Sequence, residues 1–328
     1  MEALVLGGTR FVGLHLVKYL IESGHRVTVL NRGKTQSILP ESVARLKADR
    51  SNPDSMCSAL SQKRFDKVYD ISGYKPLEVK AVLSALENRV SHYIFCSSVA
   101  VYSDNNSIPI KENGQLKRGP SGDYGRNKIL CETVLEKWSK SSGIPSTIIR
   151  PPYVYGPDDH ITRRLFSIFA RLYQKKPVIV PGSGKTLNHS VHVDDLASAF
   201  AAVSVGERAF NKTYNAAGPE PVTLETYIEL VASVMNTTAD IVKIDPSDYK
   251  KVLYEVADIE PTEICDFSWD KNYEYSIRKI QYDIGWYPKY GIIEGLQNAY
   301  EWWLENGLNK TKNEFHSDEL LLTYLKPS

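Results

Sequence analysis

The stretch Ala3-Leu4-Val5-Leu6-Gly7-Gly8-Thr9-Arg10-Phe11-Val12-Gly13 decides the fold of this chain. It begins with four apolar residues, and a short apolar run that ends at glycines is typical of a buried strand. A helical pattern follows the glycines as far as Gly24, with apolar side chains at the spacing of one helix face: Phe11, Leu14, Val17, Leu20 and Ile21. The stretch therefore predicts a strand, a glycine loop and a helix, in that order.

The same alternation continues through the first 150 residues. Further strand-like runs lie at Arg26–Leu30, Leu46–Ala48, Val68–Ile71, His92–Ser97 and Thr147–Ile149. Helical patterns separate them, beginning at about Pro53, Pro76 and Tyr124. Strands that alternate with helices pair in parallel and are covered on both faces. We expect an α/β fold with a doubly wound parallel sheet of the Rossmann type.

The alternation of strand-like and helical patterns ends after Arg150. Proline and glycine pairs at Pro151-Pro152, Gly156-Pro157 and Pro181-Gly182 predict loops, and a helical pattern runs from about Thr162 to Gln174 between them. We expect a smaller C-terminal substrate-binding domain that the chain enters twice. The expected bounds are 1–155 plus about 186–215 for the dinucleotide-binding domain, and 156–185 plus 216–328 for the substrate domain. Open α/β sheets bind ligands beyond their strand ends, so we expect a cleft at the junction.

The glycine loop is suited to hold the pyrophosphate of a dinucleotide. Gly7 permits a tight turn, Gly13 permits close packing of the helix on the sheet, and the helix N-terminus offers free N–H groups to an anion. We assign the whole loop to cofactor binding: Gly7, Gly8, Thr9, Arg10, Phe11, Val12 and Gly13. The alternative, a glycine turn that binds nothing, is disfavoured because the complete strand–loop–helix unit is present.

The end of the second strand indicates which dinucleotide binds. Leu30-Asn31-Arg32-Gly33-Lys34 contains no carboxylate to hold a ribose 2′-hydroxyl. Arg10, Arg32 and Lys34 can instead surround a 2′-phosphate, which an arginine fork suits. These residues favour NADP over NAD. The alternative is that Arg32 and Lys34 belong only to a solvated loop.

Other residues are assigned to the cofactor as well. Asp49 follows the third strand and can accept a hydrogen bond from the adenine amino group; equally, it can be a helix cap. Asn31, Pro151 and Tyr153 complete the expected cofactor-binding set.

The catalytic candidates are Ser98, Tyr124 and Lys128. Tyr124 and Lys128 lie one helical turn apart and therefore on one face, and Ser98 ends the strand-like run before them. A free tyrosine has a pKa of ~10, and a neighbouring ammonium favours its phenolate. Tyr124 can then exchange a proton with a substrate oxygen while Ser98 holds that oxygen. Lys128 can also reach the nicotinamide ribose.

The Tyr-x-x-x-Lys spacing is not specific by itself. The chain contains a second instance at Tyr275 and Lys279, without a glycine loop or a strand-end serine in the same setting. Context separates the two pairs, and it favours Tyr124 and Lys128.

Composition limits the other classes of function. The formal net charge of the 328 residues is +1, which gives no electrostatic basis for nucleic-acid or membrane binding. The four cysteines are scattered without metal-ligand spacing: Cys57, Cys96, Cys131 and Cys265. We therefore expect no metal site, no membrane span and no secretion signal. We expect a cytoplasmic location.

Several segments together resemble the extended short-chain dehydrogenase/reductase family of NAD(P)-dependent sugar epimerases, dehydratases and reductases. The resemblance covers most of the chain. Besides the glycine loop, the segments that carry it are Ser97-Ser98-Val99-Ala100-Val101-Tyr102, Tyr124–Lys128, Arg150–Pro157, Val191-His192-Val193-Asp194-Asp195-Leu196-Ala197, Tyr214–Gly218 and Ile284–Pro288. The family fold is the one expected above, and homodimers are common in it.

The chain departs from the family pattern at four places. Arg10 stands where the loop usually has glycine, and Gly-Gly-Thr-Arg-Phe-Val-Gly is similar to a divergent branch that includes chloroplast stem-loop RNA-binding proteins. Asn188 stands where many epimerases have an arginine for the nucleotide diphosphate, and Tyr153 where they often have asparagine. Ser98-Val99-Ala100 replaces the Thr-Asp-Glu of the 4,6-dehydratases, so we do not expect dehydration.

The resemblance implies an epimerase that acts on a sugar or sugar nucleotide by transient oxidation, with Tyr124 as the acid–base group. The first alternative is an NADPH-dependent net reductase of a keto-sugar or another carbonyl. The second comes from another class, a nucleic-acid-binding or scaffold protein on the same fold. A small sugar-like molecule is the expected partner, and a homodimer is the expected assembly.

Overall fold

A computed structural model gives the structure of the chain except for residues 36–38, 120–122, 160–163, 256–269, 311–321 and 324–328. The chain folds into two compact units. The first comprises Met1–Val154, Val191–Ala217 and Tyr275–Lys289, and the second comprises Tyr155–Ser190, Gly218–Glu274 and Tyr290–Ser328. The segment Tyr275–Lys289, which the sequence analysis assigned to the substrate domain, thus lies in the first unit.

The first unit is built on a seven-stranded sheet in which every pairing is parallel. The strand order is β11-β6-β5-β4-β1-β2-β3. The strands are β1 (Glu2–Leu6), β2 (Arg26–Asn31), β3 (Ala44–Lys47), β4 (Phe65–Asp70), β5 (Val90–Cys96), β6 (Ser146–Arg150) and β11 (Lys212–Asn215). The expected parallel sheet is confirmed, and β11 adds a strand to the six that the sequence indicated.

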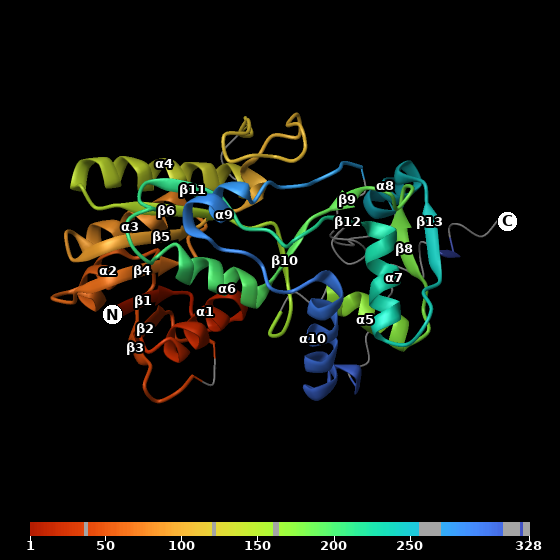
Figure 1. Ribbon diagram of the computed structural model, residues 1–328, viewed down its shortest axis with the longest axis horizontal. Helices are drawn as coiled ribbons and strands as arrows, with labels where there is room; N and C mark the ends of the chain where they lie inside the picture. Colours follow the sequence, from red (N-terminus) through yellow and green to blue (C-terminus); the bar gives the residue numbers. More distant parts are fainter. Residues whose placement is uncertain (36–38, 120–122, 160–163, 256–269, 311–321, 324–328) are drawn as a thin grey trace. The chain divides into compact units, whose positions relative to one another are not determined.

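Helices cover both faces of this sheet (Figure 1). Successive strand residues point to opposite faces, so Ala3 and Val5 of β1 enter one core while Leu4 and Leu6 enter the other. The first core is closed by α1 (Phe11–Glu22), α6 (Val193–Ala202) and α9 (Arg278–Ile284). The second is closed by α2 (Pro53–Leu60), α3 (Pro76–Leu86) and α4 (Tyr124–Ser142). The doubly wound arrangement follows from this alternation.

The helix bearing Tyr124 and Lys128, α4, begins at Tyr124, as its sequence predicts. Its N-cap is Asp123, whose carboxylate accepts the amide of Arg126 at 3.0 Å. It ends at Gly143, where φ is +73°. A short 3-10 helix, η1 (Val99–Val101), precedes it in the chain.

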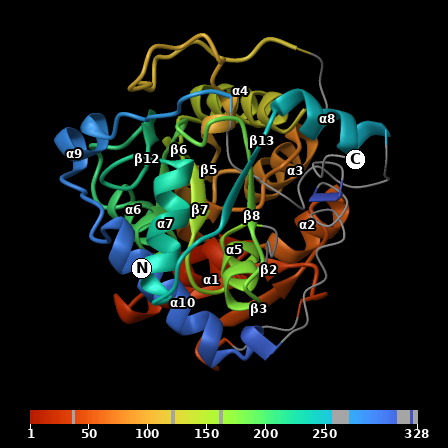
Figure 2. The same cartoon turned by 90° about the vertical axis from the view of Figure 1, so that its right-hand side faces the viewer.

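The second unit contains short sheets and four helices within the described residues. β8 (Val178–Pro181) pairs in parallel with β13 (Ile241–Ile244), and α7 (Leu224–Val234) lies beside them (Figure 2). The other elements are α5 (Leu165–Tyr173), α8 (Pro246–Glu255), α10 (Ile292–Glu305), η3 (Leu308–Lys310) and the antiparallel pair β9 (Leu187–Asn188) with β12 (Val222–Thr223). Two further strands, β7 (Tyr153–Tyr155) and β10 (Ser190–His192), form a pair of their own, and two of the three residues of each belong to the first unit. The start of the helix expected from Thr162 lies outside the described residues.

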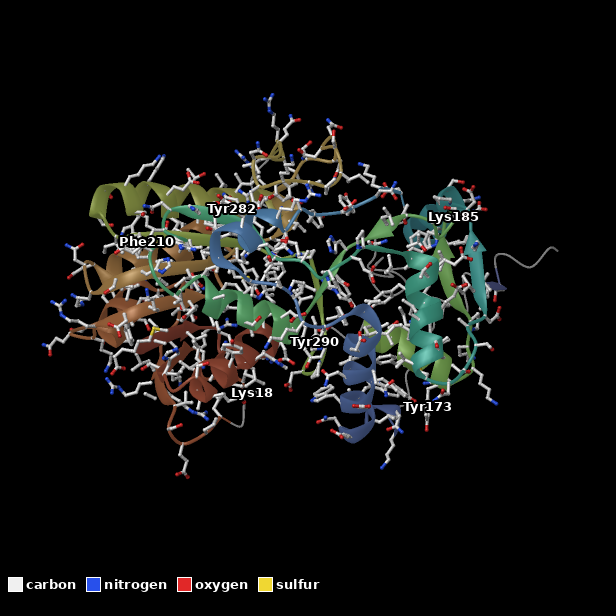
Figure 3. The ribbon with its side chains drawn as sticks, viewed as in Figure 1. Lys18, Tyr173, Lys185, Phe210, Tyr282 and Tyr290 are labelled. Carbon is white, nitrogen blue, oxygen red and sulfur yellow. The ribbon has the colours of Figure 1, made fainter. Side chains whose placement is uncertain are left out.

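Aromatic packing joins α5 to α10 in the second unit. Phe166 stacks on Trp302 with ring centroids 5.6 Å apart, and Phe169 lies 5.7 Å from Trp303. Tyr173, labelled in Figure 3, meets Trp303 edge-on at 5.7 Å. Trp302 and Trp303 are therefore packing residues of the C-terminal helix.

A buried histidine in the first unit makes stability depend on pH. The hydroxyl of Thr147 donates to the carbonyl of Ala209 at 2.6 Å, so it accepts from Nε2 of His92 at 2.8 Å. Nδ1 is then unprotonated, and it is buried without a hydrogen-bond partner among the described residues. The ring also packs edge-on against Phe210, which Figure 3 labels. Burial, with the charge of Lys67, lowers the pKa of His92 to about 3.

We expect acid to destabilise the first unit through His92. In the unfolded chain the imidazole has a pKa of ~6.5. Between about pH 6.5 and about pH 3 the unfolded state therefore binds a proton that the folded state does not bind. Stability is therefore lost as the pH falls through this window. Urea denaturation at pH 7 and pH 4.5 measures the free energy of unfolding. Its decrease between pH 7 and pH 4.5 should be smaller for His92→Gln than for the wild type. An equal loss in both proteins would contradict this assignment.

Candidate active site

The glycine loop forms the turn between β1 and α1. Gly7 has a φ of +91°, which residues with a side chain rarely adopt. Gly13 lies so close to the loop that an added Cβ would be 2.1 Å from the carbonyl oxygen of Gly7. Glycine at both positions leaves bare backbone at the start of α1, where the first helical amides have no acceptor within the helix.

The other loop residues have different surroundings. Gly8 is buried against valine side chains, and Thr9 is half-buried. Arg10 is exposed at the N-cap of α1, with extended backbone and no capping bond from its side chain. Phe11 is buried and Val12 packs against the core. Among these residues, Arg10 presents its cation to solvent.

Two cations follow β2. Arg32 and Lys34 are exposed, and between them the amide of Gly33 donates to the Asn31 side chain at 2.7 Å. This bond fixes the turn at the carboxyl end of the strand. The cations therefore stand at the edge of the sheet where the sequence analysis expected a 2′-phosphate.

Asp49 lies close to those cations. Its carboxylate accepts from the amide and the hydroxyl of Ser51 at 3.0 and 2.7 Å. These two bonds, together with the charges of Arg32 and Lys34, hold the pKa of Asp49 below its usual value. The N-cap of α2 is Asn52, which accepts the amide of Ser55 at 3.1 Å. The cap alternative for Asp49 is therefore wrong.

Ser98 begins the short helix η1 after β5. Its hydroxyl oxygen accepts the amide of Ala100 at 3.1 Å. The next amide, of Val99, donates to the carbonyl of Pro151 at 3.1 Å. Buried Pro151 thus supports the turn formed by Ser98 and η1, which we call the serine turn. Tyr153 is half-buried two residues further on, in β7. The hydroxyl of Ser98 is left on the carboxyl side of the sheet.

Gly125 allows α4, the tyrosine helix, to approach the serine turn. A Cβ on Gly125 would lie 2.1 Å from the carbonyl oxygen of Ala100, so any other residue would push α4 away from η1. Its neighbour Tyr124 is 48% exposed. The sequence analysis did not single out Gly125, because its contact is with a residue 25 positions earlier in the chain.

Lys128 is almost fully buried beside this contact. Its ammonium donates to the carbonyls of Gly73 at 2.9 Å and Cys96 at 2.7 Å, which lie beyond β4 and at the end of β5. Burial lowers the pKa of Lys128 from its usual value, although the two carbonyls are good partners for the charged form. One N–H of the ammonium is not used by these two bonds.

Three aromatic rings surround that ammonium. Its nitrogen lies 4.9 Å from the ring centre of Tyr74, 5.0 Å from that of Phe95 and 5.8 Å from that of Tyr124. Tyr74 is half-exposed, and its ring centre is 6.4 Å from that of Tyr124. Such contacts stabilise a cation over a ring face. Tyr74 belongs to this group, and no motif in the sequence pointed to it.

A buried ion pair lies behind the serine turn and the tyrosine helix. Arg150, at the end of β6, donates to both carboxylate oxygens of Glu132 at 2.9 and 2.6 Å. The hydroxyl of Ser97 donates to the same carboxylate at 2.5 Å. Glu132 is on α4, one turn after Lys128, and Ser97 precedes Ser98, so the pair connects the two elements that carry the catalytic candidates.

The arginine also holds the segment after η1. It donates to the hydroxyl of Tyr102 and to the carbonyl of Glu112, both at 3.1 Å. Tyr102 in turn donates to the Asn215 side chain in β11 at 2.6 Å. One buried guanidinium therefore connects β6, α4, the segment after η1 and β11.

The second Tyr-x-x-x-Lys pair is structural. Tyr275 is buried and stacks on Tyr102 with ring centres 6.2 Å apart. Lys279 donates to the carbonyl of Thr213 at 2.9 Å and lies over the ring of Tyr214. The distinction drawn from sequence context agrees with these surroundings.

Metal and membrane features are not seen in the described part of the chain. Its histidine, cysteine and acidic residues form no group of three or more that could hold a metal ion. No helix of the described residues combines the length and the apolar composition that crossing a bilayer requires.

Comparison with known proteins identifies a matching family and related sequences. Residues 3–217 match the model of the NAD dependent epimerase/dehydratase family. A curated relative, the chloroplast stem-loop binding protein of 41 kDa b of Arabidopsis thaliana, is 31% identical over 336 residues, which cover 98% of this chain and 84% of the relative.

Solved structures of similar fold include two epimerases. UDP-glucose 4-epimerase from Thermotoga maritima, with UDP-glucose, has a TM-score of 0.77 at 21% identity, covering 93% of this chain and 99% of that one. UDP-glucuronic acid 4-epimerase from Bacillus cereus, in complex with NAD, has a TM-score of 0.76 at 18% identity, covering 96% and 100%. At these identities the likeness shows the fold.

We expect Glu132→Gln to destabilise the first unit by about 3–5 kcal/mol, because it leaves the buried Arg150 without its counter-charge. Glu136→Gln is the matched control, since Glu136 is exposed on the same helix one turn later. Urea denaturation followed by circular dichroism measures both variants. If Glu132→Gln cost no more than Glu136→Gln, the ion pair would not hold these elements together.

Proposed function

Because the chain belongs to the NAD-dependent epimerase/dehydratase family, we propose that it epimerises a hydroxyl-bearing carbon of a sugar or sugar nucleotide by transient oxidation. The family is described as NAD dependent, and epimerases of similar fold from Bacillus cereus and Thermus thermophilus are in complex with NAD. The observation that supports the proposal most is the close approach of Gly125 to Ala100, which brings Tyr124 beside the Ser98 turn.

The residues present fit a dinucleotide at the glycine loop. Gly7 and Gly13 let the loop turn tightly and pack against the start of α1, because a Cβ on Gly7 would collide with Ser72 and one on Gly13 with the carbonyl oxygen of Gly7. The first amides of α1 have no acceptor within the helix. These amides would hold the pyrophosphate. When bound, the nicotinamide supplies a hydride acceptor in the first half of the reaction and a hydride donor in the second.

The protein's own side chains would transfer the proton of the substrate hydroxyl. Ser98 binds the substrate oxygen, and Tyr124, as the phenolate, removes the hydroxyl proton while the carbon loses hydride with its electron pair. The Lys128 ammonium, 5.8 Å from the Tyr124 ring centre, stabilises the phenolate. Its unused N–H is assigned to the nicotinamide ribose. Tyr124 returns the proton when hydride is returned to the opposite face of the carbonyl.

The second candidate is a net reductase that uses exchangeable NADPH. Arg32 and Lys34, exposed at the end of β2 with no carboxylate among residues 30–34, support it. The absorbance of the purified protein distinguishes the two. Tightly retained NAD indicates the epimerase, whereas an empty protein that consumes NADPH stoichiometrically with a carbonyl substrate indicates the reductase.

A nucleic-acid-binding function is the third candidate, because the Arabidopsis relative is named for binding a stem-loop. The net charge of +1 disfavours a strong electrostatic footprint. Retention of Ser98, Tyr124 and Lys128 favours chemistry. Salt-dependent RNA binding that persists in Tyr124→Phe, in a protein without turnover, would support this candidate instead.

The substrate and the assembly are proposed in outline only. Asn188 and Tyr153 replace residues that hold nucleotide sugars in many epimerases, so a sugar without a nucleotide is included among the candidates. We further infer a cytoplasmic homodimer, for which light scattering after gel filtration measures the mass.

We expect Tyr124→Phe to lower kcat by about 10²–10⁴-fold, because it removes the proton-transfer group without changing the shape of the ring. The cofactor Kd should stay near the wild-type value. Tyr282→Phe is the matched control, since Tyr282 is 89% exposed on α9. Steady-state kinetics with a substrate that the wild-type protein turns over measures kcat, and wild-type kcat in Tyr124→Phe would refute the assignment.

We expect Arg32→Ala to weaken NADPH binding about tenfold while leaving NADH nearly unchanged, because only NADPH has the 2′-phosphate. Arg26→Ala is the control, since Arg26 is exposed at the opposite end of β2 and pairs with Glu2. Fluorescence titration with both dinucleotides measures the Kd values. Equal weakening of NADPH and NADH would contradict a 2′-phosphate contact.

A further inference from the structure

Arg50 is a largely buried cation at the carboxyl edge of the sheet, in the loop after β3. Its side chain is 14% exposed. Nη1 donates to Oδ1 of Asp70 at 2.9 Å and to the hydroxyl of Ser72 at 3.0 Å, and Nη2 donates to Oδ2 of Asp70 at 2.7 Å. The guanidinium is therefore held in one orientation by two residues at the end of β4.

The carboxylate that holds Arg50 is itself fixed. Asp70 is fully buried, and the hydroxyl of Tyr93 donates to its Oδ2 at 2.7 Å. Burial alone would raise the pKa of Asp70, but the charge and hydrogen bonds of Arg50, with the Tyr93 bond, hold it below the usual value. Asp70 thus stays charged, and Arg50 is oriented before any ligand arrives.

Ser72 connects this cation to the glycine loop. A Cβ on Gly7 would lie 2.8 Å from Cβ of Ser72 and 2.9 Å from its hydroxyl oxygen, so the two residues face each other closely. The hydroxyl accepts from Arg50, and no described residue accepts its proton. A hydroxyl whose acceptor side is occupied by a cation is a stronger donor toward an anion.

Arg50 has hydrogen-bonding capacity that the protein does not use. A guanidinium carries five N–H donors, and three bonds are made to described residues. Nε is buried without a hydrogen-bond partner in the described part of the chain; Glu78 Oε2 is 4.0 Å away. That carboxylate faces the amides of Tyr74 and Lys75 at 3.4 and 3.3 Å, at the start of α3.

We propose that Arg50 and Ser72 form a second phosphate-binding element beside the glycine loop, which holds the pyrophosphate of the dinucleotide. This rests on the proposed function, because it concerns the cofactor of the same site. Ser72 donates its hydroxyl proton to a phosphate oxygen, and Arg50, which donates to the oxygen of that hydroxyl, polarises it. Because both are already ordered, binding costs little side-chain entropy.

The element has a different role from Arg32. Pyrophosphate is common to NAD and NADP, so Arg50 and Ser72 raise the affinity for both, whereas Arg32 acts on the 2′-phosphate alone. Loss of the element therefore lowers affinity without changing the preference between the two dinucleotides.

The test is isothermal titration calorimetry of the full chain with NAD⁺, NADP⁺, ADP and AMP. Ser72→Ala removes the hydroxyl of a half-buried residue and keeps the Arg50–Asp70 pair. Arg50→Lys keeps a cation beside Asp70 and removes the fork. The matched control is Arg89→Lys: Arg89 also has a buried Nε without a partner among the described residues, but it precedes the opposite, amino end of β5.

We expect Ser72→Ala and Arg50→Lys to weaken NAD⁺, NADP⁺ and ADP by about 10-fold or more, as for the loss of a hydrogen bond to a charged group. AMP, with one phosphate, should lose less than ADP, and Arg89→Lys should bind like the wild type. Thermal melts identify a variant that does not fold; should Arg50→Lys fail, Ser72→Ala decides.

Three results overturn the proposal. Wild-type affinities in both variants would show that Arg50 and Ser72 serve only the fold. Equal losses for AMP and ADP would place the contact away from the pyrophosphate. A wild-type protein that binds none of the four ligands would refute the proposed function itself, and with it this element; the first two results leave the proposed function standing.

Discussion

The geometry of the candidate site depends on one buried ion pair. Arg150 donates two charged hydrogen bonds to the carboxylate of Glu132. Ser97 donates to the same carboxylate, and Tyr102 accepts from the same guanidinium. Removing two charges from water is costly, and only good geometry with further hydrogen bonds repays that cost. The pair therefore tolerates few arrangements of β5, β6 and α4, which fixes the spacing between the serine turn and the tyrosine helix.

Local signals in the sequence were sufficient for most of the fold and for the glycine loop. The start of α4 at Tyr124 could be predicted, because the helical pattern of its sequence begins there. The strand before Gly7 was found for the same reason. β11 was missed as a strand, since its four residues gain their buried surroundings only by pairing with β6.

Contacts between distant segments could not be predicted in the same way. Gly125 matters because of Ala100, and Tyr74 because of Lys128. The burial of the Lys128 ammonium under Tyr74, with two carbonyl partners, is likewise a tertiary property. The sequence indicated the candidate reactive groups but not the residues that hold them, because the latter have no motif of their own.

The most direct test of the account is a crystal structure of the protein with an oxidised nicotinamide dinucleotide bound. The account expects the pyrophosphate at Gly7–Gly13, and the nicotinamide ring beside Ser98 and Tyr124, with room for a substrate carbon about 3–3.5 Å from the ring. A dinucleotide bound elsewhere on the chain, or a nicotinamide ring on the far side of the sheet edge from Tyr124, would contradict it.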